Sequence, residues 1–469
     1  MLTRYNFLFG QDPVMVSSHK REAAPKTIHM VSLGCARNQV DSETMSGQLL
    51  AHGWQLTDRA ADARVIVVNT CSFIEAAADE SLEAILTLAR HKREGRCRRL
   101  IVAGCLPERY GEKIAEALPE VDTFLGTGAF DHIIEAVDTS AEALPACLLP
   151  DPDTITSGLA QQARYRQTAH LAYLKIAEGC DRHCTYCIIP RLRGRQKSRP
   201  PEVIVAEARG LIASGARELV LVAQESTAYG SDLAGPQTLA DLLMLLSDQV
   251  DDVWLRVLYG HPSSLLEPMM RVMAERPNIC PYFDLPIQHA SNRVLRAMGR
   301  GTTRQSLERL FDQIRRVVPE AVLRTTVLTG FPGESESDFN ALRRFVETIG
   351  FDHLGVFCYS DADDLASHRL DEHVPAAVAA QRREALMACQ QPISAAKNRS
   401  RVGEVCDVLV ETDAHQPMGA GRTMGQAPEV DGVTFIDGTY DERSKPLAGD
   451  VVRVRIVDAT TYDLVGEMI

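Results

Sequence analysis

Short runs of Val, Ile and Leu alternate with amphipathic stretches over the first third of the chain. The apolar runs at 29–33, 64–68 and 99–103 show no strict alternation of apolar and polar positions, which is typical of strands buried on both faces. Stretches with helical periodicity, such as 42–52 and 80–92, separate these runs. Alternating strands and helices predict a doubly wound parallel sheet of the α/β class.

A second alternating region follows a loop-like stretch at 150–158 that is rich in Pro, Asp, Ser and Thr. It contains six strand candidates, which cover 172–178, 218–224, 254–260, 282–288, 322–329 and 353–360. Six strand–helix units are fewer than the eight that close a full barrel, so the pattern predicts a six-unit partial β/α barrel. Its binding site is expected on the loops that follow the strands.

The last part of the chain changes character. A helix-like stretch at 375–398 is expected to be interrupted near Pro392, because proline lacks a backbone donor. Beyond it, short alternating strands with Gly and Asp turns predict a small antiparallel β-barrel. The expected divisions are an extension at 1–26, an N-terminal domain at 27–140, a linker at 141–167, the partial barrel at 168–395 and the small barrel at 396–469.

Composition and charge narrow the possible functions. The 469 residues are 45% hydrophobic and 24% charged, as in an ordinary globular protein. The formal net charge is −13, and residues 396–469 carry eight Lys and Arg against thirteen Asp and Glu, so we expect no stable nucleic-acid binding. No apolar run is long enough for a membrane span, and no secretory signal is recognisable. Twelve cysteines are too few for a disulfide scaffold, so a reducing cytoplasm is the expected compartment.

Three cysteines of the first region each follow a predicted strand. Cys35, Cys71 and Cys105 lie one strand–helix unit apart. Because the carboxyl ends of parallel strands share one edge of the sheet, we expect the three side chains to meet there. A single cysteine in such a place is often only a small buried apolar residue, and three at equivalent positions favour a shared site.

A second trio forms the pattern C-x3-C-x2-C directly after the first strand of the partial barrel. Cys180, Cys184 and Cys187 could bind three irons of an iron–sulfur cube and leave the fourth free for S-adenosylmethionine. A structural zinc site usually needs a second ligand pair a dozen or more residues away, and none follows here. A thioredoxin-like interpretation of the last two cysteines would leave Cys180 unexplained.

The remaining candidates are weaker. Gln224, Gly330 and Gly333 follow strands of the partial barrel and are predicted to contact the cofactor, with a turn or capping role as the alternative. Other polar residues share this edge, namely Glu225, His261, Gln288 and His289. A basic run forms either a solvated loop or a contact with anionic groups of the cofactor or substrate, and comprises Arg191, Arg193, Arg195, Lys197 and Arg199. Six cysteines are interpreted as packing residues: Cys97, Cys147, Cys280, Cys358, Cys389 and Cys406.

Several longer motifs resemble the methylthiotransferase family of radical S-adenosylmethionine (SAM) enzymes, over nearly the full length of the chain. They are SLGCARNQVDSE (32–43), VNTCSFI (68–74), AGCLPERY (103–110), KIAEGCDRHCTYCIIPRLRG (175–194), LPIQHASNRVLRAMGRGTT (285–303) and RTTVLTGFPGE (324–334). Within the family, the chain looks most like the branch that modifies an aspartate of ribosomal protein S-twelve. The pair Glu225-Ser226 departs from the Asp-Thr of this branch, so the role of Glu225 stays open.

The resemblance implies two 4Fe–4S clusters and a C-terminal TRAM barrel for the substrate. Cys35, Cys71 and Cys105 match the ligands of an auxiliary cluster, and the second trio matches the ligands of the radical SAM cluster. One S-adenosyl-L-methionine would methylate sulfur at the auxiliary cluster. A second would be cleaved to a 5′-deoxyadenosyl radical, which removes hydrogen from the β-carbon of the aspartate. An electron donor such as flavodoxin or ferredoxin is also implied.

Two alternatives remain at this point. A tRNA adenosine methylthiotransferase would use the same scaffold, but the acidic terminal barrel suits a basic protein better than phosphates. The stretch LPIQHAS also resembles the protein-modifying branch, where the tRNA enzymes typically have SGS. A non-enzymatic iron–sulfur sensor would need the clusters but not the cleavage of SAM, so formation of 5′-deoxyadenosine distinguishes it from an enzyme.

Overall fold

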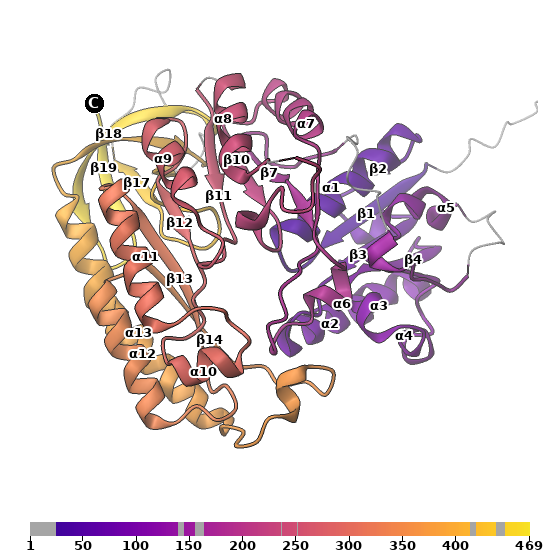
Figure 1. Cartoon of the computed structure of the whole chain (residues 1–469). Coiled ribbons are helices and arrows are strands. Elements are labelled where there is room, and N and C mark those ends of the chain that lie inside the picture. Colours follow the sequence, from indigo (N-terminus) through magenta and orange to yellow (C-terminus); the bar gives the residue numbers. More distant parts are fainter. Residues whose placement is uncertain are drawn as a thin grey trace, which may run out of the picture.

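The computed structural model describes residues 25–138, 145–154, 164–235, 237–250, 252–412, 419–437 and 446–469. Nearly all of the predicted extension at 1–26 lies outside these residues. Figure 1 shows the N-terminal unit beside the first strands of the partial barrel, with the C-terminal barrel at the far side. No helix in the described ranges is both long and apolar enough to span a bilayer.

The N-terminal unit is a six-stranded, fully parallel sheet with the order β2-β1-β3-β4-β5-β6. Its strands are β1 (Thr27–Ser32), β2 (Gln55–Leu56), β3 (Val65–Thr70), β4 (Arg99–Gly104), β5 (Thr123–Leu125) and β6 (Cys147–Leu148). Its helices are α1 (Ala36–Ala51), α2 (Glu75–Glu94), α3 (Cys105–Tyr110), α4 (Lys113–Ala117) and α5 (Ile133–Val137). The edge strand β6 falls inside the segment predicted as a linker.

The burial of strand β3 shows that helices cover both faces of the sheet. Every residue of β3 is buried, because successive side chains point into two different cores. Ile66 packs with Ile85 of α2 on one face, and Val67 packs with Met45 of α1 on the other. The uninterrupted apolar runs of the sequence are therefore strands covered by helices on both sides, and the predicted sheet is confirmed.

The central unit is a partial barrel of six parallel strands. Two ladders, β7-β10-β11 and β12-β13-β14, meet through a single bridge between Leu255 and Ile279. The strands are β7 (Leu171–Lys175), β10 (Glu218–Val222), β11 (Trp254–Val257), β12 (Tyr282–Asp284), β13 (Val322–Thr329) and β14 (His353–Cys358). The helices are α6 (Ile189–Arg193), α7 (Pro201–Ala213), α8 (Leu239–Gln249), α9 (Glu267–Glu275), α10 (Asn292–Ala297), α11 (Arg304–Val317) and α12 (Glu336–Ile349), and a short pair joins β8 (Ala177–Glu178) to β9 (Lys197–Ser198). Each of the six predicted strands is present, which confirms the partial barrel.

A long helix, α13 (Ala376–Ser400), crosses from the partial barrel to the small barrel and continues through Pro392. The expected interruption near Pro392 is therefore wrong. Side chains on both sides of the proline bind the backbone beside β14: Gln390 donates to the carbonyl of Phe351 at 2.8 Å, and Ser394 donates to that of Asp352 at 3.1 Å. These contacts favour the helix over the break that proline alone would cause.

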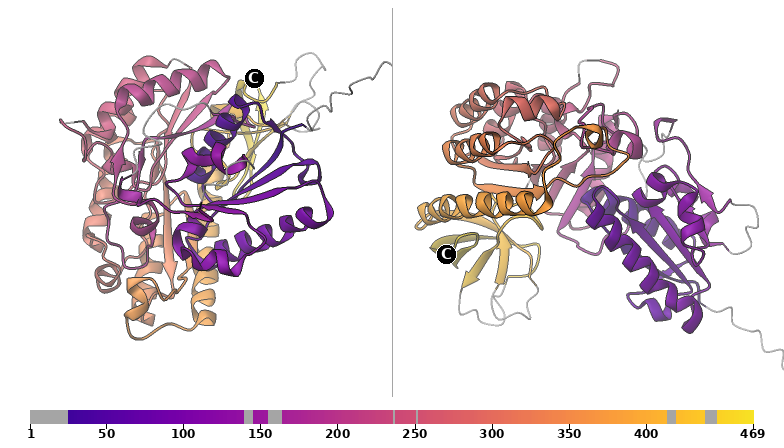
Figure 2. Two further views of the ribbon diagram at one scale, coloured as in Figure 1. Left: turned by 90° about the vertical axis from the view of Figure 1, so that its right-hand side faces the viewer. Right: turned by 90° about the horizontal axis from the view of Figure 1, so that it is seen from below.

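The C-terminal unit is a closed five-stranded barrel in the order β15-β16-β17-β19-β18, packed against α13 (Figure 2). Its strands are β15 (Val405–Val410), β16 (Gly419–Arg422), β17 (Thr434–Asp437), β18 (Val451–Ala459) and β19 (Leu464–Met468). Neighbouring strands are antiparallel except β17 and β19, which are parallel. The closed barrel is confirmed, but it is not wholly antiparallel, because directions cannot alternate all the way round a ring with an odd number of strands.

A buried ion-pair network joins the small barrel to the partial barrel. Glu218, at the start of β10, accepts hydrogen bonds from Arg256 and from Arg422, each at 2.6 Å. All three side chains are fully or almost fully buried. The guanidinium of Arg256 also donates to the carbonyl of Met424. The small barrel is therefore held in a fixed position on the partial barrel.

Candidate functional site

The first cysteine trio lies at the carboxyl edge of the N-terminal sheet. Cys35 precedes α1, Cys71 follows β3 and Cys105 begins α3, and the preceding strands β1, β3 and β4 are neighbours in the sheet. Gly34 has a φ of +89°, and a Cβ atom there would lie 2.9 Å from the Sγ atom of Cys71. The absence of a side chain at Gly34 thus allows the Cys35 loop to pack against Cys71.

The pKa values of the three thiols in this trio are shifted in different directions. Burial raises the pKa of Cys105 to about 11, although Arg193 acts in the opposite direction. Burial also raises the pKa of Cys71. At Cys35 the same burial effect is outweighed by the guanidinium groups of Arg37 and Arg193, so the pKa of this thiol is lowered. Binding of metal by this trio requires thiolates, and the positive charge of Arg37 and Arg193 favours the thiolate at Cys35.

The second trio lies on the loop after β7 and β8. The backbone N–H of Arg182 donates to the Sγ atom of Cys180 at 3.4 Å, and Arg300 donates to the Sγ atom of Cys184 at 3.7 Å. The side chain of Arg182 forms two hydrogen bonds, at 2.7 and 2.9 Å, to the buried carboxylate of Glu225 after β10. This pair fixes the cysteine loop against the next strand of the barrel.

Burial raises the pKa of Cys180 to about 11 and that of Cys187 to about 12. The uncharged thiol is therefore the resting form of both groups at neutral pH. Thiolates are the ligands of iron–sulfur clusters, so binding would release protons from this loop. The backbone hydrogen bond from Arg182 to Cys180 favours the charged form that binding requires.

Both trios fit the donor set of an iron–sulfur cluster. Across the described ranges, no three His, Cys, Asp or Glu side chains gather closely enough to bind one metal ion. A cluster differs from a single ion, because each thiolate binds its own iron atom. Each trio also has a guanidinium N–H directed at one sulfur, from Arg193 to Cys105 and from Arg300 to Cys184, both at 3.7 Å. Hydrogen bonds to cluster sulfurs are a feature of such sites.

The substitution Gly34→Ala is expected to lower the iron bound per chain to about half, because the added methyl group would press on Cys71. A residue other than glycine with positive φ also costs about 1–3 kcal/mol of backbone strain. Gly53→Ala is the matched control, since Gly53 has a similar φ of +78° but no atom within 4 Å of the added Cβ. Iron and sulfide analysis of the reconstituted proteins measures the effect. An equal loss of iron in both variants would assign it to strain alone.

The structure gives each predicted cofactor-contacting residue a partner within the protein. Gln224 donates to the carboxylate of Glu178. Gly330 has a φ of +80°, and a side chain there would meet Ala379 of α13. The N–H of Gly333 donates to the carbonyl of Glu372 at 2.8 Å. Gly333 also has a φ of +79°, which favours glycine, and contact with a cofactor stays a prediction for all three residues.

Other candidates at this edge are wholly or partly buried in the protein. Burial lowers the pKa of His261 to about 3, so its ring is neutral near pH 7. The ring of His289 is fully buried, with its Nε2 atom 3.6 Å from the carboxylate of Glu334. Gln288 has a φ of +68° and bridges to Val327 in β13. His289 and Gln288 therefore help to order the loops around β13.

The solvated-loop interpretation does not hold for two members of the basic run. Arg193 and Arg199 are each 3% exposed and paired with carboxylates of the protein. Arg199 binds Glu207 of α7 at 2.5 Å. Arg191 and Arg195 are exposed, as expected for a solvated loop. The sequence could not distinguish these positions, because the run has no helical periodicity and its partners lie in other segments.

Sequence reasoning missed a buried charge network between the two cysteine trios. Arg193 donates to Asp41 of α1 at 2.8 Å and to Glu178 at 3.3 Å, and Lys175 also pairs with both carboxylates. Asn38 of α1 accepts a further hydrogen bond from Arg193 at 2.6 Å. The sequence signal for this network was the set of polar residues within the motif SLGCARNQVDSE, which lie on the buried side of α1. They dock the N-terminal unit onto β7, as the position of α1 in Figure 1 illustrates.

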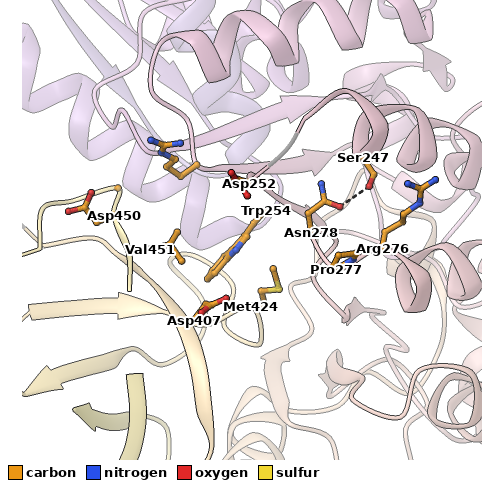
Figure 3. Close-up of a pocket in the computed structure, with 12 residues that line it drawn as sticks. Ser247, Asp252, Trp254, Arg276, Pro277, Asn278, Asp407, Met424, Asp450 and Val451 are labelled. Atoms are coloured by element: carbon orange, nitrogen blue, oxygen red, sulfur yellow. Dashed lines mark hydrogen bonds between the residues drawn. The ribbon is translucent and has the colours of Figure 1, made fainter. Parts of the chain in front are cut away.

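A cleft of about 730 Å³ lies between the partial barrel and the small barrel (Figure 3). Arg217 precedes β10 and Trp254 begins β11, so the cleft opens at the amino ends of the strands. Asp407 and Met424 line it from the small barrel. The second cysteine trio follows the carboxyl end of a barrel strand, and the cleft is therefore on the opposite edge of the partial barrel from this trio.

Three family models match separate parts of the chain. They are the Uncharacterized protein family UPF0004 over residues 27–126, the Radical SAM superfamily over residues 174–346 and the TRAM domain over residues 402–469. The first two ranges contain the first and second cysteine trios, respectively. The third contains the five strands of the closed barrel.

Curated relatives match over almost the whole length. A protein of Desulfosudis oleivorans named ribosomal protein uS12 methylthiotransferase RimO is 56% identical over 440 residues, which are 94% of this chain and 99% of that protein. Proteins of the same name from Anaeromyxobacter sp. strain K and Clostridioides difficile are 46% and 42% identical, each over 94% of this chain and over 93% and 98% of their own.

Among solved structures, the radical S-adenosylmethionine methyltransferase TsrM from Kitasatospora setae, with cobalamin and a 4Fe–4S cluster bound, is similar to this chain. The TM-score is 0.54 at 15% identity, over 71% of this chain and 75% of that one. A second structure of the same enzyme, with tryptophan and a SAM analogue, gives a TM-score of 0.52. These similarities show a shared fold.

Proposed function

The chain belongs to the RimO group of radical SAM methylthiotransferases, and on this premise we propose that it adds a methylthio group to the β-carbon of an aspartate in ribosomal protein uS12. The observation that carries the proposal is the full-length match at 56% identity to a protein of that name. As a radical SAM protein, the chain uses an iron–sulfur cluster and S-adenosyl-L-methionine.

In this proposal the two trios have separate roles. Cys180, Cys184 and Cys187 hold the radical SAM cluster, and the trio of the N-terminal unit holds a second, auxiliary 4Fe–4S cluster. When bound, the clusters and SAM supply radical and methyl-transfer chemistry that no side-chain acid or base can perform on an unactivated C–H bond. Arg193 and Arg300 donate toward one sulfur of each trio.

The remaining parts of the proposal concern partners and compartment. A small electron-transfer protein such as flavodoxin or ferredoxin would supply the electrons. The acidic small barrel supports a basic protein as substrate rather than RNA. All twelve cysteines are free thiols, which agrees with a reducing cytoplasm as the proposed compartment.

An anaerobic competition assay tests this function. Reconstituted protein is mixed with SAM, a reductant, uS12 and bulk tRNA, and both substrates are then analysed by mass spectrometry. We expect a methylthio mass gain on the aspartate of uS12 alone. A gain on tRNA adenosine would overturn the substrate but keep the enzyme class, and absence of 5′-deoxyadenosine would indicate a sensor.

A further inference from the structure

Arg37 extends from the N-terminal unit to the carboxyl edge of the partial barrel. It lies two residues after Cys35, in the first turn of α1. Its Nη1 atom donates to the carbonyl of Ala223, directly after β10, at 2.9 Å. Its guanidinium lies over the ring of Tyr259, which follows β11, 4.6 Å from the ring centroid. A carbonyl and an aromatic face thus hold this cation at the edge where the barrel strands end.

Arg37 also differs from the other cations around it. Arg193 and Lys175 share the carboxylates of Asp41 and Glu178, and Arg182 is paired with Glu225. For Arg37, by contrast, no Asp or Glu of the described residues lies within ion-pairing distance, although the side chain is partly buried. Within the described residues, one of the five N–H donors of Arg37 is used, in the bond to Ala223, and a partly buried guanidinium of this kind can bind an external anion.

Arg300, at the same edge, also has no carboxylate partner among the residues that the structure describes. It is 8% exposed, and its two terminal nitrogens already contact the Sγ atom of Cys184 and the carbonyl of Pro286. Arg300 is therefore committed to the second trio. Arg37 lies two residues after Cys35 of the first trio, and its partner Ala223 lies two residues before Glu225, which pairs with Arg182 of the second cysteine loop. Arg37 is therefore placed beside the segments that carry both trios.

We propose that Arg37 binds the carboxylate of the target aspartate, an inference that rests on the proposed function. A guanidinium and a carboxylate form a planar, bidentate pair. The β-carbon of aspartate is bonded directly to its carboxylate carbon, so fixing the carboxylate also fixes the carbon that reacts. An adenosine of tRNA has no carboxylate, and the same contact therefore favours a protein substrate.

A binding cycle with two substrates tests this inference. Reconstituted wild-type, Arg37→Lys and Arg37→Met proteins are titrated, without reductant, with uS12 and with uS12 whose target aspartate is changed to asparagine. Hydrogen bonds to charged groups are typically worth enough for about a 10- to 100-fold preference. We expect wild-type protein to prefer the aspartate form by this factor, the Lys variant to keep part of the preference, and the Met variant to lose it.

Controls separate this result from other causes. Arg217→Met removes an exposed arginine at the opposite edge and should leave both affinities unchanged. Iron analysis shows whether each variant still binds its clusters. If Arg37→Met binds less iron than wild-type protein, the Arg37→Lys variant is the test, and a reduced preference for the aspartate form of uS12 in that variant supports the inference. An unchanged preference for aspartate in the variants would overturn the inference. Failure of the wild-type protein to modify uS12 in the competition assay would instead overturn the proposed function.

Discussion

Replacing Cys35, Cys71 or Cys105 with alanine is expected to reduce methylthio transfer to background while leaving the cleavage of SAM intact. The reason is the separation of the two trios, which lie in different units and are joined by the network around Arg193. In the proposed assignment, loss of a thiolate from the first trio removes a ligand of the auxiliary cluster only. Replacing Cys180, Cys184 or Cys187 should abolish both reactions, because the cluster that cleaves SAM would lose a ligand.

The measurement is the yield of 5′-deoxyadenosine and of methylthiolated uS12 from the same anaerobic reaction. Cys389→Ala is the matched control, since Cys389 is a partly buried thiol on α13 outside both trios. It should retain both products. Normal methylthio transfer by a variant of the first trio would show that the assigned roles are wrong.

Removing the charge of Glu218 is expected to cause the largest loss of stability in the chain. Glu218→Gln leaves Arg256 and Arg422 buried without their shared carboxylate. Breaking a buried ion pair in this way typically costs about 3–5 kcal/mol. Trp254 lies in the same core as Leu409 and Ala427 of the small barrel, so its fluorescence reports on this junction. Urea unfolding in a Trp54→Phe background, where Trp254 is the sole tryptophan, measures the change.

The effect of Glu218 should depend on pH. Burial alone would raise the pKa of this carboxyl group, but Arg256 and Arg422 outweigh burial and lower it below its ordinary value of 4.5. The folded chain therefore keeps the charge at pH values where the unfolded chain is protonated. The stabilisation is complete above about pH 5 and is lost as the pH falls. The difference between wild-type and Glu218→Gln proteins should shrink accordingly in acid.

A surface pair provides the control for this result. Asp248 binds Arg276 at 2.6 Å, but both side chains are at least one-third exposed, at 52% and 36%. Exposed pairs contribute about 0–1 kcal/mol. Asp248→Asn should therefore change the unfolding midpoint little, and a loss as large as that of Glu218→Gln would contradict the role assigned to burial.

The sequence by itself predicted the parallel sheet, the partial barrel and the small barrel, and it placed the two cysteine trios directly after strands. Parallel strands buried on both faces need uninterrupted apolar runs, which are visible in the sequence. Cysteines that follow such strands, such as Cys71, lie at the same edge because the carboxyl ends of parallel strands share one edge. The three cysteines of C-x3-C-x2-C lie within one short loop, so their spacing alone predicts binding of an iron–sulfur cluster. These features depend on neighbours in the chain or on a repeating pattern.

Only the tertiary structure decided how the units meet. The sequence pattern favoured a solvated basic loop for Arg193 and Arg199. Both are instead buried and paired with Asp41 and Glu207, which lie in other segments of the chain. Likewise, Pro392 remains within α13 because the backbone beside β14 supplies contacts on both sides of it. Arg37 differs from the other cations only in the folded chain, where no carboxylate of the described residues lies within ion-pairing distance of it. A charged side chain is stable inside the protein only when folding brings an oppositely charged partner to it. That partner lies in a distant segment, so no local pattern in the sequence predicts it.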